Sequence, residues 1–414
     1  MNSLDVLLNL ILWIYTHSPP YVVNDYINGL QMTSNPDSYL TPPQIIARNG
    51  YPIETHIVPT QDGYLLQLHR IPHGKSDNAN RNRYPILLIH GGPDSSAAWI
   101  ENGPEKSLAY LLADNGFDVW MMNMRGNTFS TAHITFTPKE REFWNFSYHE
   151  IGIYDIPASI DYVLNKTNHE QLFCIGYSIG NSVFYIMLSE LPQYNDKIVA
   201  QISLAPFLTL VHERQVLGFL ANILKSALEQ LYWNTPGGIA QHDLETKLEL
   251  RILNSIYIFG YSLNDILINL IYGMPLHHLN KDTAPILLNN WPAGTSVKAA
   301  LHFHQMLDSF ANFDYGSEEN LKMYGTSRPS EYNISNIKVP IRVYYAVSDT
   351  IAGPEEAIPL YEKLPVKAGI VEITDPMFYH MDYMSNANIN QLLNDDVLNV
   401  IPYMIFNTSN QASQ

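Results

Sequence analysis

The stretch Gly176-Tyr177-Ser178-Ile179-Gly180 decides the fold that this chain predicts. It follows the short apolar run at residues 171–175 and precedes residues 181–190, whose apolar spacing is compatible with a helix. A serine between two glycines at such a junction is typical of a sharp strand-to-helix elbow, where any other side chain would strike the neighbouring strand or helix. We therefore expect Ser178 to be a nucleophile held on a strained backbone.

Segments on both sides of this elbow alternate between strand-like and helix-like patterns. A hairpin is predicted at residues 51–71, and strand-like runs follow at 86–89, 117–122 and 198–204 with helical segments between them. The strand pattern returns at 339–345 and 370–373. Strand and helix in alternation predict an α/β fold with a mostly parallel central sheet flanked by helices.

The alternation stops between about residues 207 and 301, where the sequence is helix-like and rich in apolar residues. We interpret this part as an inserted helical cap or lid. The predicted organisation is a signal peptide at 1–18, the first part of the core at 19–206, the cap at 207–301, the second part of the core at 302–405 and a C-terminal tail at 406–414.

A serine nucleophile needs an imidazole as general base and a carboxylate that orients this imidazole. Asp349 follows the strand that is expected to end near residue 346, and His380 lies in the loop after the last strand. Both positions are at the carboxyl edge of the sheet, which the elbow also faces. We therefore predict Ser178, Asp349 and His380 as the catalytic residues. Asp375 and Asp382 are the rival acids, but they are so close to His380 in sequence that we expect them to cap its loop.

The oxyanion of an acyl-transfer intermediate requires backbone N–H donors. The residue after the nucleophile, Ile179, is predicted to supply one donor. The loop His90-Gly91-Gly92-Pro93-Asp94 follows the strand at 86–89, and Gly92 is our prediction for the second donor. His90 precedes this loop, so we expect it to brace the loop.

Composition restricts the partners of the chain. Its 414 residues are 46% apolar, enough for one large domain with an insertion or for two domains. A formal net charge of −17 argues against nucleic acid and anionic membranes as electrostatic partners. No metal site, cofactor or obligate protein partner is predicted. Cys174 is the only cysteine, so no intrachain disulfide can form, and its place in an apolar strand predicts a core residue.

Several features of the sequence indicate the secretory route. The apolar stretch at residues 6–15 has the length of a signal-peptide core and is too short to span a bilayer. Asp5 before it and Pro19 after the best cleavage site are unusual for a signal peptide, which leaves an uncleaved anchor or a buried helix as alternatives. Four glycosylation sequons begin at Asn145, Asn165, Asn333 and Asn407, and Asn145 ranks below Asn333 and Asn165 because its aromatic neighbours predict burial.

From about Asn35 to Ile401 the chain resembles the acid lipase family, the gastric and lysosomal lipases of animals. The opening hairpin is similar at residues 50–52, 62–65 and 69–74, the stretches before the elbow at 123–130 and 154–161, and the return from the cap at 292–297 and 313–316. The resemblance implies an α/β-hydrolase fold, and it places the family's triad on Ser178, Asp349 and His380 and its oxyanion positions on Gly92 and Ile179.

The chain also departs from the family pattern. The family usually has histidine and glutamine around the nucleophile where this chain has Tyr177 and Ile179, and paired leucines where it has Gly92 and Pro93. The family's cap commonly carries cysteines, and this cap has none.

Together these patterns predict a serine hydrolase that acts on neutral lipid esters, such as triacylglycerols or sterol esters, at a lipid–water interface. It would be secreted or reside in the lysosomal lumen. A proline aminopeptidase-like hydrolase remains an alternative because of the sequence His90-Gly91-Gly92-Pro93, and so does a non-catalytic lipid-binding protein of the same fold.

Overall fold

A computed structural model describes residues 35–76, 82–209, 229, 232, 237–239, 257–258, 261–262 and 283–411. The predicted signal peptide and most of the predicted cap lie outside these residues. The longer strands are β1 (Glu54–Pro59), β2 (Tyr64–Ile71), β3 (Pro85–Ile89), β4 (Asp118–Met121), β6 (Leu172–Tyr177), β7 (Ile198–Leu204), β12 (Ile341–Ala346) and β13 (Lys367–Ile373). Two-residue strands are β5 (Ala132–His133), β8 (Gly238–Ile239), β9 (Tyr257–Ile258), β10 (Tyr261–Ser262) and β11 (Thr295–Ser296).

The helices alternate with these strands, as the pattern predicted. The α-helices are α3 (Pro42–Arg48), α4 (Leu108–Asp114), α5 (Tyr148–Glu150), α6 (Ile156–Thr167), α7 (Ile179–Glu190), α11 (Ala284–Asn290), α12 (Val297–Met306), α13 (Ser317–Tyr324), α14 (Pro354–Lys363), α15 (Asp382–Ser385) and α16 (Asp395–Gln411). Shorter helical turns are η1 (Pro36–Tyr39), η2 (Ser96–Trp99), η3 (Arg141–Trp144), η4 (Ile151–Asp155), η5 (Pro192–Lys197), η7 (Ile334–Asn336) and η8 (Asn390–Asn394).

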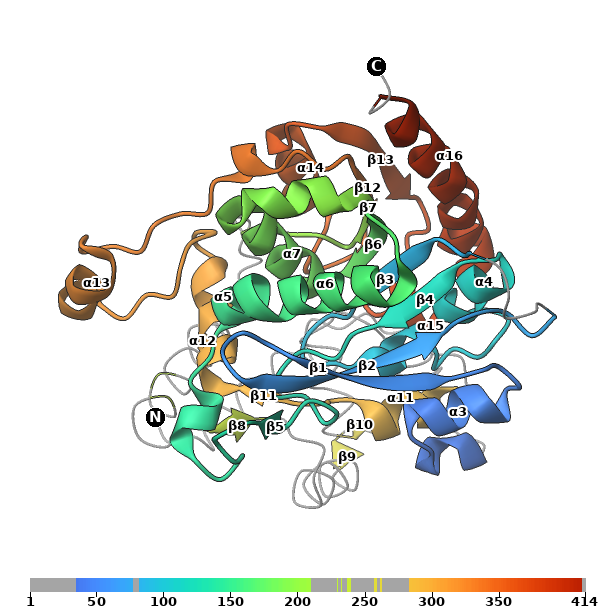
Figure 1. The fold of residues 1–414 in the computed structure, drawn as a ribbon, viewed down its shortest axis with the longest axis horizontal. Helices are drawn as coiled ribbons and strands as arrows, with labels where there is room; N and C mark the ends of the chain where they lie inside the picture. Colours follow the sequence, from blue (N-terminus) through green and yellow to red (C-terminus); the bar gives the residue numbers. More distant parts are fainter. Residues whose placement is uncertain are drawn as a thin grey trace.

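The central sheet has the strand order β1-β2-β4-β3-β6-β7-β12-β13, with β5 paired to β2. The β1–β2 hairpin is antiparallel, β2 pairs antiparallel with β4, and every later pairing in this order is parallel. Helices α6 and α7 lie on one side of the sheet and α4 and α16 on the other (Figure 1). This is the α/β-hydrolase arrangement that the sequence predicted, and it places the carboxyl ends of the parallel strands along one edge.

The parallel strands β3, β6 and β7 are buried on both faces, which explains why they read as continuous apolar runs rather than as alternating ones. Every residue of β3, β6 and β7 is buried. Cys174 of β6 belongs to this core, and burial raises the pKa of its thiol well above the usual range, as expected of a residue that only packs. The buried core therefore supports the loops at the carboxyl edge of the sheet.

Within residues 207–301, the four short strands β8, β9, β10 and β11 depart from the predicted helical character. Short antiparallel pairs join β9 to β10 and β8 to β11. The sequence between β9 and β10 is Phe259-Gly260, a two-residue connection with glycine that favours a hairpin over a helix. Tyr232 lies in the predicted cap and is buried against Phe313, Val297 and Leu301. At this position the apolar character of the cap reflects packing.

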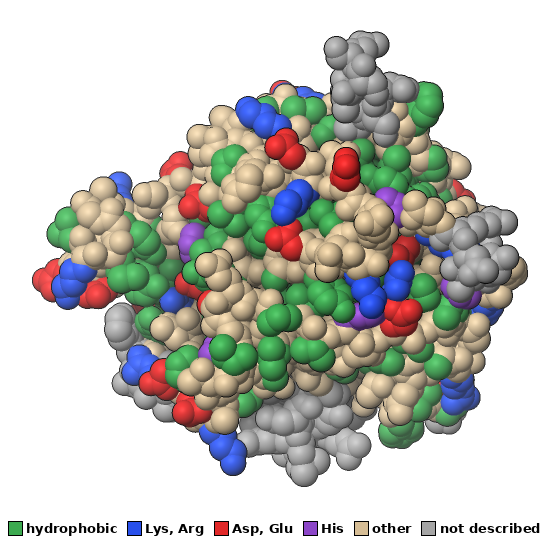
Figure 2. Space-filling model, viewed as in Figure 1, with side chains coloured by type: hydrophobic (Ala, Val, Ile, Leu, Met, Phe, Trp, Pro, Cys, Tyr) green, Lys and Arg blue, Asp and Glu red, His purple; other side chains and the backbone are tan. Residues whose placement is uncertain are grey.

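Figure 2 shows one face of the molecule, on which α13 forms the projection at the left. Acidic and basic side chains of the described residues are interspersed on this face and gather in no continuous basic patch. Among the described residues, no helix is both long and apolar enough to cross a membrane.

Candidate active site

Ser178 lies at the elbow between β6 and α7, with φ 53° and ψ −126°, a conformation that residues with a side chain rarely adopt. Its backbone N–H donates to Leu204 O at 3.0 Å, which ties the elbow to the end of β7. A Cβ atom at Gly176 would collide with Asn181 Oδ1, and one at Gly180 would collide with Ile89 O. Both glycines are therefore required by the close approach of the chain segments, as the pentapeptide predicted.

The structure brings Ser178, His380 and Asp349 together from three separate loops. His380 Nε2 lies 2.9 Å from Ser178 Oγ, and His380 Nδ1 lies 2.8 Å from Asp349 Oδ2. All three residues are buried, and the exposed fraction of Ser178 is 7%. A hydroxyl, an imidazole and a carboxylate in this order can pass a proton from the hydroxyl to the imidazole while the carboxylate stabilises the resulting charge.

Asp349 is fixed by the loop that follows β12. Its Oδ1 accepts hydrogen bonds from the backbone N–H groups of Ile351 and Ala352, at 2.8 and 2.9 Å. Both carboxylate oxygens thus have hydrogen-bond partners, and the oxygen that faces His380 is held in one orientation. Charge-assisted bonds of this kind stabilise the ionised carboxylate.

The two rival acids serve the loop of His380 instead. Asp375 Oδ1 accepts from Met377 N at 2.8 Å, and Asp382 Oδ2 accepts from Tyr379 N at 2.7 Å. Asp382 is buried, and burial raises its pKa to about 6. The expectation that Asp375 and Asp382 cap this loop is confirmed.

The loop after β3 approaches the elbow closely. A Cβ atom at Gly91 would lie 3.2 Å from Ser178 Cβ, and one at Gly92 would lie 3.0 Å from Ile179 Cγ2. Ile179 is the first residue of α7, where a backbone N–H has no partner within the helix. The structure therefore places the two predicted oxyanion positions next to each other and beside Ser178. Among the described residues, Gly92 N–H has no hydrogen-bond acceptor.

His90 braces this loop, as expected. Its Nε2 accepts from Met124 N at 3.2 Å, so Nδ1 carries the proton and donates to Gly91 O at 2.6 Å. Burial lowers the pKa of His90 to about 4, so it stays neutral in this role near pH 7. The return from the cap supports the same loop, because Ala293 N donates to Pro93 O at 2.9 Å.

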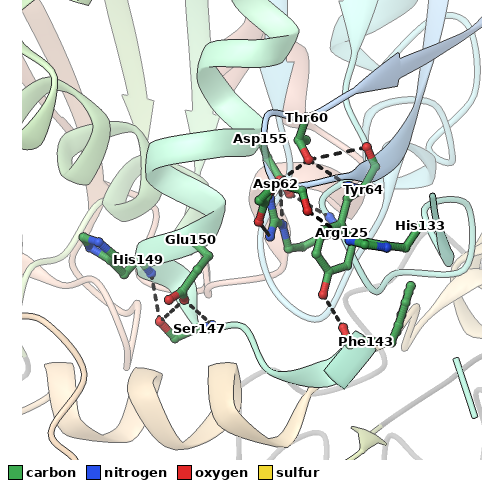
Figure 3. Close-up of polar contacts among 10 residues, drawn as sticks. All are labelled: Thr60, Asp62, Tyr64, Arg125, His133, Phe143, Ser147, His149, Glu150 and Asp155. Carbon is green, nitrogen blue, oxygen red and sulfur yellow. Dashed lines mark hydrogen bonds and ion pairs between the residues drawn. The ribbon is translucent and has the colours of Figure 1, made fainter. Parts of the chain in front are cut away.

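An ionic cluster surrounds the buried Arg125 (Figure 3). Arg125 lies between Asp62 in the β1–β2 turn and Asp155 at the start of α6, and the guanidinium carbon is 4.0 Å from the centre of the Tyr64 ring. Arg125 N and Nε donate to the two oxygens of Asp155 at 2.9 and 2.7 Å. The cluster joins three elements: the β1–β2 hairpin, the loop after β4, and the start of α6. The sequence stretches 62–65, 123–130 and 154–161 therefore belong to one structural unit.

Sequence reasoning noted Tyr177 as unusual but assigned it no role. Its ring centre lies 5.3 Å from that of His380, and the residue is 6% exposed. A large polar aromatic residue next to the nucleophile indicates a role, but the sequence does not show which way the side chain points. Among the described residues, no group of three or more His, Cys, Asp or Glu side chains is arranged to hold a metal ion.

The exposure of one sequon asparagine, Asn145, differs from its prediction. Asn165 and Asn333 are exposed, as their ranking assumed, but Asn145 is exposed as well and accepts a hydrogen bond from Lys298 Nζ at 3.2 Å. The predicted burial of Asn145 is wrong, because its aromatic neighbours Phe143, Trp144 and Phe146 turn into the core while the asparagine points outward. The side chain of Asn407 lies outside the described residues.

Comparison with known proteins identifies the family and the fold of the chain. The model for a partial α/β-hydrolase lipase region matches residues 42–103, and the α/β-hydrolase fold model matches residues 84–240. Lipase 1 of Drosophila melanogaster is 36% identical over 88% of this chain and 80% of its own length. Human gastric triacylglycerol lipase is 32% identical over 89% of this chain and 92% of its own length.

Solved structures show the fold alone. A soluble variant of monoglyceride lipase from Saccharomyces cerevisiae superposes with a TM-score of 0.52 at 14% identity, covering 86% of this chain and 95% of that one. The identity and coverage of the sequence relatives carry the stronger conclusion. This chain belongs to the acid lipase family of α/β-hydrolases.

Proposed function

We propose that this protein is a serine hydrolase of carboxylic esters, a lipase, with Ser178 as nucleophile, His380 as general base and Asp349 as the residue that orients His380. The observation that carries the proposal is the continuous hydrogen-bonded chain from Ser178 Oγ through His380 to Asp349 at the carboxyl edge of the sheet. The names of the sequence relatives support ester hydrolysis and do not favour a proline aminopeptidase.

In the acylation step, Ser178 Oγ attacks the ester carbonyl carbon while His380 Nε2 takes the hydroxyl proton. The carbonyl electrons move to the oxygen, which becomes an oxyanion facing the N–H groups of Gly92 and Ile179. When the intermediate collapses, His380 gives its proton to the leaving alcohol. Water then attacks the acyl-enzyme with His380 again as base, which releases the acid and restores Ser178.

The proposed substrates are neutral lipid esters, triacylglycerols or sterol esters, bound at a lipid–water interface. Two observations support this class. A formal net charge of −17 disfavours anionic surfaces, and the human relative is named for triacylglycerols. The cap of residues 207–301 is the part of the chain proposed to meet the acyl chains, between core segments 19–206 and 302–405.

The Ser178→Ala variant tests the chemistry. It should lose hydrolysis of a long-chain triacylglycerol emulsion and labelling by a fluorophosphonate probe, while its thermal unfolding stays close to that of the wild type. Substantial hydrolysis by the variant would refute the nucleophile assignment. If the wild type bound lipid but neither hydrolysed esters nor reacted with the probe, a non-catalytic lipid-binding role would replace the proposal. Profiling the wild type against triacylglycerols and cholesteryl esters from pH 4 to 8 would separate the two substrate groups.

The proposed destination is the outside of the cell, with the lysosomal lumen as the alternative. Residues 1–18 would act as the signal peptide, and exposed Asn165 and Asn333 would carry glycans. Expression in a secretory cell line should yield a protein in the medium whose mass falls on treatment with peptide-N-glycosidase F. Each of the variants Asn165→Gln and Asn333→Gln should lose the mass of one glycan. A protein retained in the cytosol without glycans would contradict this route.

A further inference from the structure

The hydroxyl group of Tyr148 lies against the predicted oxyanion position Gly92. A Cβ atom at Gly92 would be only 2.9 Å from Tyr148 Oη, as well as 3.0 Å from Ile179 Cγ2. Because real Cβ contacts are not this short, the hydroxyl and Ile179 occupy the space that a side chain at position 92 would need. Tyr148 thus borders the same small region that contains the two backbone donors.

This hydroxyl is an exception among the buried tyrosines of the described residues. Tyr148 is 5% exposed and has no hydrogen-bond partner in the part of the chain that the structure describes. Nine other buried tyrosines have polar partners: Tyr51, Tyr64, Tyr110, Tyr177, Tyr185, Tyr332, Tyr344, Tyr345 and Tyr383. The hydroxyl oxygen of Tyr148 keeps some access to solvent, so it can donate a hydrogen bond to an oxygen that arrives with the substrate.

The backbone on both sides of Tyr148 is held in place by hydrogen bonds. Ser147, directly before it, forms a capping box with Glu150, in which Ser147 N and Oγ donate to Glu150 Oε2 at 2.6 and 2.7 Å (Figure 3). On the other side of the segment, Ser296 Oγ donates to Phe146 O at 2.5 Å. Burial raises the pKa of the Tyr148 phenol, so the group keeps its proton and acts as a donor. A donor fixed in advance needs no reorganisation when charge develops.

We propose that the Tyr148 hydroxyl is a third donor to the oxyanion, beside the N–H groups of Gly92 and Ile179. Ile179 has no polar side chain, and the Tyr148 hydroxyl lies against the same Gly92 position. It donates a hydrogen bond as the carbonyl oxygen becomes negative and keeps its own proton throughout. The Ser178 proton moves to His380 and then to the leaving alcohol, so the balance of the reaction is unchanged.

The test uses the Tyr148→Phe variant of the full chain, which removes one oxygen atom and keeps the ring. With p-nitrophenyl butyrate as substrate, kcat should fall about 10- to 100-fold while KM changes less than about twofold, because the interaction forms mainly in the transition state. The inhibition constant of phenylboronic acid, which forms a tetrahedral adduct with the serine, should rise by a comparable factor.

Tyr185→Phe is the matched control. Tyr185 is buried in α7, and its hydroxyl contacts Ser203 Oγ at 2.7 Å, away from the oxyanion loop. This variant should keep kcat and boronate affinity even if its melting temperature falls. If Tyr148→Phe instead raised KM with kcat and boronate affinity unchanged, or if it lost no more activity than Tyr185→Phe, the oxyanion role would be overturned.

The inference rests on the proposed function, and the two can fail separately. An inactive Ser178→Ala variant together with a fully active Tyr148→Phe variant rejects only the third donor. A Ser178→Ala variant with wild-type activity rejects the nucleophile assignment whatever Tyr148→Phe does.

Discussion

The hydroxyl of Tyr177 donates a hydrogen bond to the backbone carbonyl oxygen of His380 at 2.8 Å. The residue next to the nucleophile thus holds the loop that carries the base, although 203 positions separate the two in sequence. The tilted contact between their rings adds a second restraint. The unusual tyrosine in the pentapeptide therefore connects two of the three proposed catalytic residues.

Replacing Tyr177 by phenylalanine should remove this hydrogen bond and keep the ring contact. We expect kcat to fall by about 3- to 10-fold, because a neutral hydrogen bond contributes roughly 1 kcal/mol and its loss lets the His380 loop move. Steady-state kinetics on a soluble ester would measure the effect. Tyr194→Phe, which removes a hydroxyl that donates to Asp161 on the surface, is the control and should have wild-type kinetics. Equal kinetics for the two variants would show that the Tyr177 bond does not position His380.

The choice of Asp349 as the acid can be tested against its neighbour Asp382. Asp349→Asn replaces the carboxylate beside His380 Nδ1 by a neutral amide. The amide cannot stabilise the positive charge that forms on His380, so kcat should fall about 10³- to 10⁴-fold. Asp382→Asn should lower the melting temperature by weakening the cap on Tyr379 N, while kcat stays within about tenfold of the wild type. Stopped assays at matched protein concentration would rank the two variants. The reverse ranking would transfer the acid role to Asp382.

Arg125 is expected to contribute to stability rather than to chemistry. Arg125→Met would leave the fully buried Asp155 without its charge partner, and breaking a buried pair in this way costs about 3–5 kcal/mol. Thermal unfolding followed by circular dichroism should show a clear drop in melting temperature, with much of the specific activity per folded molecule retained at low temperature. Arg48→Met provides a control, because Arg48 pairs with Asp37 at the surface. Similar melting temperatures for both variants would argue against the role of the buried cluster.

The raised pKa values of Asp94 and Glu101 predict that stability falls as the pH rises from about 4 through neutral pH. Burial raises the pKa of Asp94 from 3.8 to about 7, and burial with the nearby Asp94 charge raises the pKa of Glu101 well above its usual range. Since these pKa values are higher in the folded than in the unfolded state, the contribution to stability is complete below about pH 4 and is lost as the pH rises through about 7.

The Glu101→Gln variant stays neutral at every pH, so its melting temperature should exceed that of the wild type by a few degrees, roughly, at pH 8 and differ little at pH 5. Burial lowers the pKa of histidines such as His69 to about 4, so their contribution to stability is lost as the pH falls. The comparison is therefore made between variant and wild type at each pH. Glu362→Gln, an exposed carboxylate, should give no pH-dependent difference. A Glu101→Gln variant that is no more stable than the wild type at pH 8 would contradict the raised pKa.

The sequence was sufficient for most of the sheet because its signals are local. Buried parallel strands such as β6 and β7 are continuous apolar runs, and the glycines around Ser178 are demanded by contacts within a few residues. The proposed catalytic residues could be placed because each follows the end of a strand, and strand ends meet at one edge.

Other features depended on distant contacts and could not be read in advance. The bond from Tyr177 to His380 joins segments whose separation in space no local pattern encodes. The unpartnered hydroxyl of Tyr148 becomes visible only when the surroundings of Gly92 are known. The outward direction of Asn145 was missed because its neighbours, and not its own type, were used to judge its burial.

The collision between any side chain at position 180 and the carbonyl oxygen of Ile89 has a consequence for protein engineering. It locks the start of α7 to the end of β3, so the nucleophile and the oxyanion loop form one block whose internal spacing cannot be adjusted by mutation. New substrate preferences would have to be selected at side chains that border that block, such as that of Ile179. Libraries that vary Gly176 or Gly180 should yield inactive or unfolded proteins, whereas a library at Ile179 keeps its backbone N–H in place.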